Sequence, residues 1–306
     1  MKRPLHIGLR LPALGTFEPG KRGNIQGDEQ VARAWAKYLL RRDDVRSVTL
    51  YDASSHITGD LDVLIHFNPF LDLHDKARNI LYLQNVFPES HHAGGTVGVF
   101  RQVQSRYAGF LFTSRPLMQS CADGGVVPFA TDPETFFPQP DTRYQVPVAF
   151  VGNDIRGGSI NRRYFYPAME LGLVIYGNDW TPPLSTLCRG KLPMGDLPKL
   201  YSTASINLNA HIAEHIRFGT INLRLFDILA CGGFVISDHS AALDQAFGEA
   251  VVCTDGHEDE WAKIVRYLSD APERTRRSEL GRKIVLDSHT YERRVDDLMT
   301  YLHAIL

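Results

Sequence analysis

The amino-acid sequence predicts an α/β protein built from two doubly wound domains, each with a parallel sheet covered by helices. First, 306 residues are enough for two cores, since single domains typically hold about 150 residues. Second, short apolar runs alternate with helix-length amphipathic runs, which is the pattern of parallel sheets. Third, the proline-rich segment Val126–Pro138 interrupts this alternation, so we expect the two domains to join there.

The first half opens as strand, loop, helix and strand. Leu5–Leu11 is predicted to be a strand, and a loop rich in glycine and proline follows up to Gly27. Asp28 can cap the helix Glu29–Leu40, and Val45–Tyr51 returns as a second strand. The other elements expected in this half are strands at Leu61–Phe67, Ile80–Leu83 and Gly109–Thr113 and a helix at Arg115–Cys121.

The alternation restarts after the proline-rich segment, and Ile221–Asp238 is its most informative stretch. Its apolar residues first follow helical spacing, the pair Gly232-Gly233 ends the helix, and Phe234–Ile236 begins a short buried strand. Beyond this stretch we expect strands at Val148–Val151, Leu173–Gly177 and Ser205–Asn209 and helices at Asn161–Leu171, Leu197–Thr203, Trp261–Leu268, Glu273–Leu286 and Tyr291–Leu306.

Composition excludes several classes of protein. A net charge of −2 argues against a nucleic-acid binder, which would need a basic face. No run approaches the roughly 20 apolar residues of a membrane helix, so any membrane contact would be peripheral. The N-terminus lacks the apolar region of a secretory signal, and we expect a cytoplasmic protein. The four cysteines form no Cys-x-x-Cys pair, so neither a zinc ribbon nor a disulfide framework is indicated.

The stretch Ile221–Asp238 also predicts an anion site. Asn222, Arg224 and Asp227 fall on the N-terminal part of its helix, where free backbone N–H groups and the helix dipole favour negative charge. In doubly wound folds the ligand lies where loops leave the carboxyl ends of the strands. We therefore expect a phosphate-bearing ligand, most naturally in a cleft between the two halves.

Several motifs resemble those of a known family. The segment Val127–Pro138 is similar to the interdomain segment of group 1 glycosyltransferases of the GT-B fold, with a proline, a small residue, Asp-Pro-Glu, an aromatic residue and a final proline. The second half resembles the CgeB-like branch, named after spore maturation proteins, in motifs at Phe150–Asn153, Ile175–Trp180, Arg189–Leu192, Leu197–Tyr201, Leu223–Gly233 and His289–Arg294.

The resemblance implies a GT-B fold in which two Rossmann-like domains face a cleft. It implies an acceptor-side domain at 1–138, a nucleotide-sugar-binding domain at 139–288, and a C-terminal helix at 289–306 that crosses back to the first domain. The implied activity is metal-independent transfer of a sugar from a nucleotide-diphosphate donor to a glycan or glycolipid acceptor of the cell envelope or surface. Retention of configuration is favoured, although Gly219, where many group 1 members carry a glutamate, leaves inversion open.

The expected donor site lies in the second domain. Arg224 is expected to reach the donor phosphates, and Asp227 stands where the family has a glutamate that contacts the ribose. Glycine turns allow close approach to a ligand, and arginines can bind a diphosphate by paired hydrogen bonds. The other residues expected around the donor are Gly152, Asn153, Arg156, Arg162, Arg163, Tyr176, Gly177, Asn178, Gly190, Lys191, Asn209, His211, Arg217 and Asn222.

The first domain offers the candidate catalytic residues. Gly23 and Asn24 belong to a glycine-rich loop after the first strand that could approach the donor sugar. His66 ends a strand where group 1 enzymes carry a cleft histidine, and it could bind the sugar or take a proton. Asp28 is a second candidate base, in competition with its role as a helix cap. Residues expected on the acceptor side are Gln84 and Asn85.

Three alternatives stay open. His211–His215 fits the zinc pattern His-x-x-Glu-His, but Phe218-Gly219 follows so soon that a long helix has little room, and we expect no metal. The departures at Asp227 and Gly219 allow a non-catalytic module that binds nucleotide or glycan. The third alternative is that the protein is a sugar-nucleotide epimerase with the GT-B fold. No cofactor is expected beyond the nucleotide-diphosphate sugar as substrate.

Overall fold

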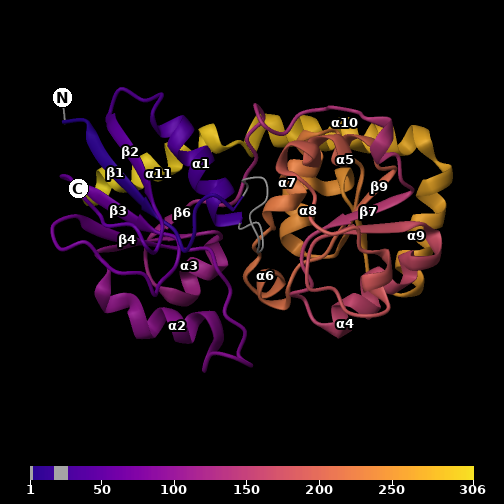
Figure 1. Ribbon diagram of the computed structural model, residues 1–306, viewed down its shortest axis with the longest axis horizontal. Coiled ribbons are helices and arrows are strands. Elements are labelled where there is room, and N and C mark those ends of the chain that lie inside the picture. Colours follow the sequence, from indigo (N-terminus) through magenta and orange to yellow (C-terminus); the bar gives the residue numbers. More distant parts are fainter. Residues whose placement is uncertain (1–2, 17–26) are drawn as a thin grey trace. The chain divides into compact units, whose positions relative to one another are not determined.

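The computed structural model describes residues 3–16 and 27–306, and it forms two compact units (Figure 1). The first unit comprises residues 1–129, 218–220 and 291–306, and the second comprises residues 130–217 and 221–290. Each unit is built around one parallel sheet with helices on its faces, as the alternation of apolar and amphipathic runs predicts.

The first unit contains a six-stranded parallel sheet in the order β2-β1-β3-β4-β5-β6. Its strands are β1 (Leu5–Arg10), β2 (Val45–Tyr51), β3 (Val63–His66), β4 (Arg78–Leu83), β5 (Gly109–Phe112) and β6 (Gly125–Val126). Its helices are α1 (Gly27–Leu39), α2 (Gly95–Val103), α3 (Arg115–Cys121) and α11 (Tyr291–Ile305).

The core of the first unit centres on an aromatic cluster. The ring of Trp35, on α1, lies 5.3 Å from that of Phe67 and 4.8 Å from that of Tyr82, and all three side chains are buried. Such tilted and edge-on pairs contribute beyond the area they bury. The cluster therefore fixes α1 against the ends of β3 and β4.

Helix α11 packs within the first unit although it is the last element of the chain, and Figure 1 shows it beside α1. Its apolar face is buried through Tyr291, Val295, Leu298, Met299 and Leu302. The backbone N–H of Phe110, on β5, donates to the Tyr301 hydroxyl at 2.9 Å. The helix thus covers one face of a sheet whose strands all come from the first half of the sequence.

The second unit contains a five-stranded parallel sheet in the order β11-β10-β9-β7-β8. Its strands are β7 (Val148–Val151), β8 (Leu173–Tyr176), β9 (Ile206–Asn209), β10 (Val235–Asp238) and β11 (Val252–Thr254). The helices that follow in sequence are α4 (Gly158–Ile160), α5 (Leu197–Thr203), α6 (Ala213–Phe218), α7 (Leu223–Ala230), α8 (Ala241–Phe247), α9 (Glu258–Ser269) and α10 (Ala271–Ser288).

Strand register brings polar strand ends to one edge of the second sheet. Ser237 of β10 pairs with Asn209 of β9, and Val151 of β7 pairs with Tyr176 of β8. All these strands are parallel, so their carboxyl ends lie on the same side. The loops that leave this edge carry most of the residues expected at the donor site.

The structure departs from the predicted elements in a few places. The single helix expected at Asn161–Leu171 is irregular, with a π-helical part at Asn161–Phe165 and a 3₁₀ part at Tyr166–Leu171. Pro167 explains part of this, since proline has no N–H to donate to a regular helix. Helices α2 and α8 were not among the expected elements.

Within residues 3–16 and 27–306, no helix combines the length and the apolar composition that crossing a lipid bilayer requires.

Candidate functional site

The turn after β7 is built on close backbone approach. A Cβ atom on Gly152 would lie 2.7 Å from Nη2 of Arg224, and one on Gly177 would lie 2.0 Å from the carbonyl oxygen of Gly152. Neither position has room for a side chain. Trp180 Nε1 donates to the Gly152 carbonyl at 2.9 Å and holds this turn in place.

Arg156 leaves the same turn and lies over the ring of Phe150, with its guanidinium carbon 4.9 Å from the ring centroid. Its Nε donates to the carbonyl of Ala210 at 2.8 Å, and its Nη1 donates to the carbonyl of Asn153 at 3.0 Å. Backbone carbonyls fix the side chain without neutralising its charge.

Arg224, in the first turn of α7, uses the same aromatic ring. Its guanidinium carbon lies 4.6 Å from the centroid of Phe150, and its Nη1 donates to Oδ1 of Asn209 at 3.1 Å. In the described part of the chain, neither Arg156 nor Arg224 forms an ion pair with a carboxylate. Two half-buried cations therefore share one aromatic ring and lack a direct counter-charge.

The pKa of Arg156 reflects this arrangement. Desolvation first, and then the positive charge of Arg224, lower the pKa of Arg156 to about 9. Desolvation also lowers the pKa of Arg224, although the charges of Asp227 and Asp238 oppose it. Both side chains are cations near pH 7, and an anion placed between them would relieve their repulsion.

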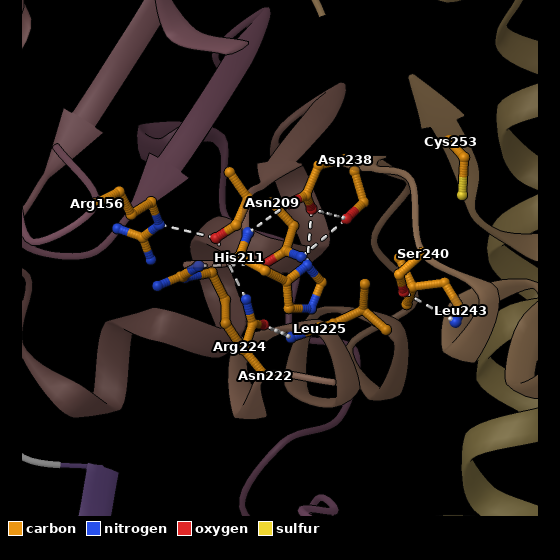
Figure 2. Close-up of polar contacts among 12 residues, drawn as sticks. Arg156, Asn209, His211, Asn222, Arg224, Leu225, Asp238, Ser240, Leu243 and Cys253 are labelled. Carbon is orange, nitrogen blue, oxygen red and sulfur yellow. Dashed lines mark hydrogen bonds and ion pairs between the residues drawn. The ribbon is translucent and has the colours of Figure 1, made fainter. Parts of the chain in front are cut away.

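A chain of hydrogen bonds runs from Arg224 into the sheet edge (Figure 2). Asn209 accepts from Arg224 and donates through Nδ2 to Oγ of Ser237 at 2.9 Å. Ser237 in turn donates to Oδ1 of Asp238 at 3.0 Å. Asp238 also accepts from the backbone N–H of His211 at 2.8 Å and contacts His211 Nδ1 at 2.7 Å.

The Asp238 carboxylate is the charged centre of this chain. Burial by itself would raise the pKa of Asp238, but the electrostatic interaction and hydrogen bonds with His211, together with the Ser237 hydroxyl, outweigh it, and the pKa is lowered. An ionised carboxylate only accepts hydrogen bonds. His211 therefore carries a proton on Nδ1, and its Nε2 is buried with no hydrogen-bond partner among the described residues.

Asn222 caps the N-terminus of α7. Its Oδ1 accepts from the backbone N–H of Leu225 at 3.4 Å, and its Nδ2 donates to the carbonyl of Ala210 at 3.4 Å. Asparagine is a preferred N-cap residue because its side chain satisfies an N–H that the helix leaves unpaired. The cap places Arg224 and the segment around His211 on the same side of the sheet edge.

The predicted residues near β8 form a second group beside the turn after β7. The backbone N–H of Asn178 donates to Oδ1 of Asn153 at 3.0 Å, and the N–H of Gly177 donates to the carbonyl of Gly190 at 2.9 Å. Tyr176 is buried, and Lys191 follows directly after Gly190. The structure thus brings these predicted residues together with the glycine turn.

Four predicted donor residues lie apart from this group. Arg162, Arg163 and Arg217 are exposed, and Arg163 Nε donates to the carbonyl of Asp255 at 2.6 Å. Asp227 is 3% exposed, and its Oδ1 accepts from the Thr131 hydroxyl at 2.8 Å. In this structure Asp227 is bonded inside the second unit, and its contact with a ribose stays a prediction.

The candidate residues of the first unit form their own group. Gln84 Nε2 donates to Oδ1 of Asn85 at 3.0 Å, and both side-chain amides donate to the carbonyl of Phe67. Asp28 lies in the first turn of α1, where burial raises its pKa and a hydrogen bond with Gln84 partly offsets the effect. Gly23 and Asn24 lie outside the described residues.

His66 is fully buried. Its Nε2 contacts Oδ1 of Asn79 at 2.9 Å, and burial lowers its pKa to about 4. The ring is therefore neutral near pH 7 and enclosed in the first unit. Its expected part in proton transfer stays a prediction.

The zinc-like pattern is not assembled as a metal centre. Helix α6 begins after His211, and the rings of His211 and His215 lie 6.2 Å apart at a steep angle. Burial lowers the pKa of His215 to about 3. Among residues 3–16 and 27–306, no three His, Cys, Asp or Glu side chains are grouped to hold a metal ion.

Three residues of the site were not predicted from the sequence: Phe150, Ser237 and Asp238. Phe150 belongs to a motif that resembles the family, yet its role as a ring shared by two arginines depends on tertiary contacts. Asp238 had a usable signal, because a charged residue two positions after the apolar pair Val235-Ile236 marks the carboxyl end of a buried strand.

Comparisons with known proteins bear on the family and on the fold. Residues 159–300 match the family described as glycosyl transferase-like. Sucrose-phosphate synthase from Thermosynechococcus elongatus has a similar structure over 98% of this chain and 99% of its own, at 11% identity and a TM-score of 0.66. The Anabaena protein HepE in complex with UDP-glucose is similar over 98% of this chain and 100% of its own, at 10% identity and a TM-score of 0.65.

A glycosyltransferase from Rickettsia africae is similar over 100% of this chain and 99% of its own, at 11% identity and a TM-score of 0.62. A comparison with curated protein sequences gives no match. At such low identities the solved structures establish the fold alone, and they confirm the fold class predicted from the sequence. The chain has the GT-B fold, and its residues 159–300 resemble the glycosyl transferase-like family.

Proposed function

We propose that this protein transfers a sugar from a nucleoside diphosphate sugar to a glycan or glycolipid acceptor. The observation that carries the proposal is the pair Arg156 and Arg224, which share the ring of Phe150 and have no carboxylate partner in the described chain. Two uncompensated guanidinium groups beside a glycine turn and a capped helix N-terminus form a setting that favours a diphosphate.

The chemistry of transfer supports this assignment. When the sugar–oxygen bond breaks, negative charge develops on the departing nucleoside diphosphate, and fixed positive groups stabilise it. Arg156 and Arg224 would supply that charge, with backbone carbonyls and Asn209 holding them in place. We therefore propose that transfer proceeds without a metal ion.

The structural neighbours bear on the donor. HepE was solved with UDP-glucose, and its similarity in fold makes UDP-glucose the first donor to test. The edge of β8, with Tyr176 and the turn from Gly177 to Asn178, is the proposed resting place of the base. A hexose donor is part of this proposal.

The finer assignments rest on the resemblance of the sequence motifs. They are membership of the CgeB-like branch, retention of configuration at the sugar, and an acceptor of the cell envelope or cell surface reached at the cytoplasmic face of the membrane. Product anomers identified by NMR would test retention, and inversion would remove that part alone.

The test of the proposal is a donor panel. The purified protein is incubated with UDP-, GDP- and dTDP-sugars in buffer containing EDTA, and thermal stabilisation, donor hydrolysis and release of nucleoside diphosphate are measured. We expect stabilisation by one nucleotide and slow hydrolysis of its sugar. Absence of binding to every nucleotide would contradict the proposal, and isomerised donor with little release of diphosphate would favour an epimerase.

A further inference from the structure

His211 holds a hydrogen-bonding group whose partner is missing in the described chain. The side chain is 1% exposed, and Nε2 is buried without a hydrogen bond. Buried polar atoms are usually paired, so an unpaired one at a ligand site indicates a missing partner. His211 directly follows Ala210, whose carbonyl accepts from both Arg156 and Asn222. The orphan atom therefore belongs to the neighbourhood of the two arginines.

The pairing with Asp238 decides what Nε2 can bind. Asp238 accepts from Nδ1 of His211 at 2.7 Å, which places a ring proton on Nδ1. In the neutral imidazole, Nε2 then carries a lone pair and accepts a hydrogen bond. A lone pair at Nε2 suits a hydroxyl donor and repels a phosphate oxygen.

Charged and titratable groups surround this pair on several elements. Arg156 and Arg224 belong to this neighbourhood, since both act electrostatically on His215, as His211 does. The groups that face the pair from the surrounding elements are Asp238 on β10, His215 on α6, Arg224 on α7, Arg156 after β7, Tyr164 in the helical run after α4, and Glu260 on α9. Asp238 is the carboxylate bonded to the ring.

We infer that His211 is a sugar-recognition residue, whose Nε2 accepts a hydrogen bond from a hydroxyl of the donor hexose. The inference rests on the proposed function and names the part of the donor that His211 contacts. Arg156 and Arg224 bind the diphosphate, and the chain Asn209–Ser237–Asp238 fixes His211 at a set distance from it. Asp238 acts as the positioning residue.

The experiment separates recognition of the sugar from recognition of the nucleotide. Titration calorimetry gives the ratio of the dissociation constants of UDP and UDP-glucose, and of GDP and GDP-mannose, for each variant. His211→Asn is the test variant, because an asparagine amide takes the place of Nδ1 and still donates to Asp238 but has no group at the Nε2 position. His211→Gln is the rescue variant, because its longer amide can place an oxygen near that position.

A matched control is available one residue beyond Asp238. His239 also pairs with an aspartate, Asp244, at 2.8 Å, but both side chains are about half exposed. His239→Asn should leave the ratio unchanged. Melting temperatures of all variants show whether each is folded.

We expect His211→Asn to keep its affinity for the bare nucleotide and to lose about two- to tenfold of the added affinity for the nucleotide sugar, the range of one neutral hydrogen bond. His211→Gln should recover part of it. An analogue lacking the contacted hydroxyl should bind wild type and His211→Asn equally. An unchanged ratio in a folded His211→Asn would overturn the inference and leave the proposed function standing, whereas absence of nucleotide binding to wild type would overturn both.

Discussion

Phe150 sets the charge balance of the site at the scale of single residues. Its ring lies 4.6 Å from the guanidinium carbon of Arg224 and 4.9 Å from that of Arg156. A ring face attracts a cation, so one aromatic side chain offsets part of the repulsion between two arginines. The site can therefore hold two cations before an anion arrives.

Arg224→Gln should weaken nucleoside diphosphate binding by about ten- to a hundredfold, since a hydrogen bond to a charged group contributes about 1.5–3 kcal/mol. The difference in affinity between wild type and Arg224→Gln should become smaller in high salt, because salt screens the attraction between Arg224 and the diphosphate. Isothermal titration calorimetry measures it. Arg266→Gln, an exposed arginine on α9 of the same unit, is the control. Equal affinities for Arg224→Gln and wild type would remove Arg224 from the anion site.

Asp227 and Thr131 form a buried pair that gives a second prediction. Thr131→Val keeps the shape of the side chain but removes the hydroxyl that donates to Asp227 at 2.8 Å. Leaving a buried carboxylate short of a donor should lower the free energy of unfolding by about 1–3 kcal/mol, measured by urea denaturation.

Thr135→Val is the matched control, because the Thr135 hydroxyl donates to Asp132 at 2.7 Å from an exposed side chain. Its effect should stay within about 0.5 kcal/mol. Equal losses in the two variants would show that burial of the Asp227 pair does not matter for stability.

Residue chemistry was predictable from the sequence where it depends on local position. Arg224 and Asn222 could be expected at a helix N-terminus because helical spacing and the glycine pair locate that helix. The pairing of His211 with Asp238 could not, because 27 residues separate them and only the register of β9 with β10 brings them together. Likewise, the burial of His66 follows from packing that a single strand does not reveal.

At the scale of elements, α9 carries a buried acid against the ends of β10 and β11. Glu260 is 2% exposed, and its Oε2 has no partner among the described residues. Desolvation first, and then the charges of Asp238 and Asp259, raise its pKa to about 8 against an opposing hydrogen bond from Thr254. The folded protein therefore holds Glu260 protonated well above pH 4.5.

The raised pKa predicts how stability depends on pH. The unfolded chain releases the Glu260 proton near pH 4.5 and the folded chain near pH 8. The contribution of Glu260 to the free energy of unfolding is therefore complete below pH 4.5 and decreases as the pH rises to about 8. The decrease is about 1.4 kcal/mol per pH unit at most. Glu260→Gln should flatten this decline in denaturation curves recorded across that range. Glu258 is an exposed neighbour, so Glu258→Gln should leave the decline of stability with pH unchanged. Identical stability curves for Glu260→Gln and wild type would contradict the raised pKa of Glu260.

Elements were predictable in proportion to their length and regularity. Nine strands were predicted because short, fully apolar runs between turn residues allow few other readings, and the long helix α10 was predicted from its extent. Strands β6 and β11 were not predicted, because they have only two and three residues. The irregular helical segment after α4 was not predicted in its observed form, because a π-helical part and a 3₁₀ part have no simple spacing of apolar residues. Helix α8, with seven residues, spans only two turns.

At the scale of the whole molecule, the first unit depends on the last helix of the chain. Helix α11 buries five apolar side chains there, and Arg42 and Asp44 pair with Asp296 and His303. Each buried apolar side chain contributes about 1.5–3 kcal/mol, so the helix contributes as much as the net stability of a typical domain, about 5–15 kcal/mol. The general fold was predictable because both sheets follow from alternation within each half.

Truncation after Thr290 should unfold the first unit and spare the second. Hydrogen exchange of the backbone amides should become fast in β1 to β5. The strands of the second unit should stay protected, because the core of that unit contains no residue of α11. The truncated protein should therefore keep its affinity for the nucleotide. Leu306 is 46% exposed, so its removal alone should change neither the hydrogen exchange of the first unit nor that of the second. Protected first-unit strands in the truncated protein would show that α11 is dispensable.

The place of α11 also fixes an order of events during protein synthesis. Domains usually fold as units while the chain emerges from the ribosome, with the N-terminal one first. Here the second unit has all its residues once Thr290 has emerged, whereas the first unit waits for residues up to 306. The half that is translated first is therefore the half completed last, and its exposed sheet must stay soluble until the C-terminal helix arrives.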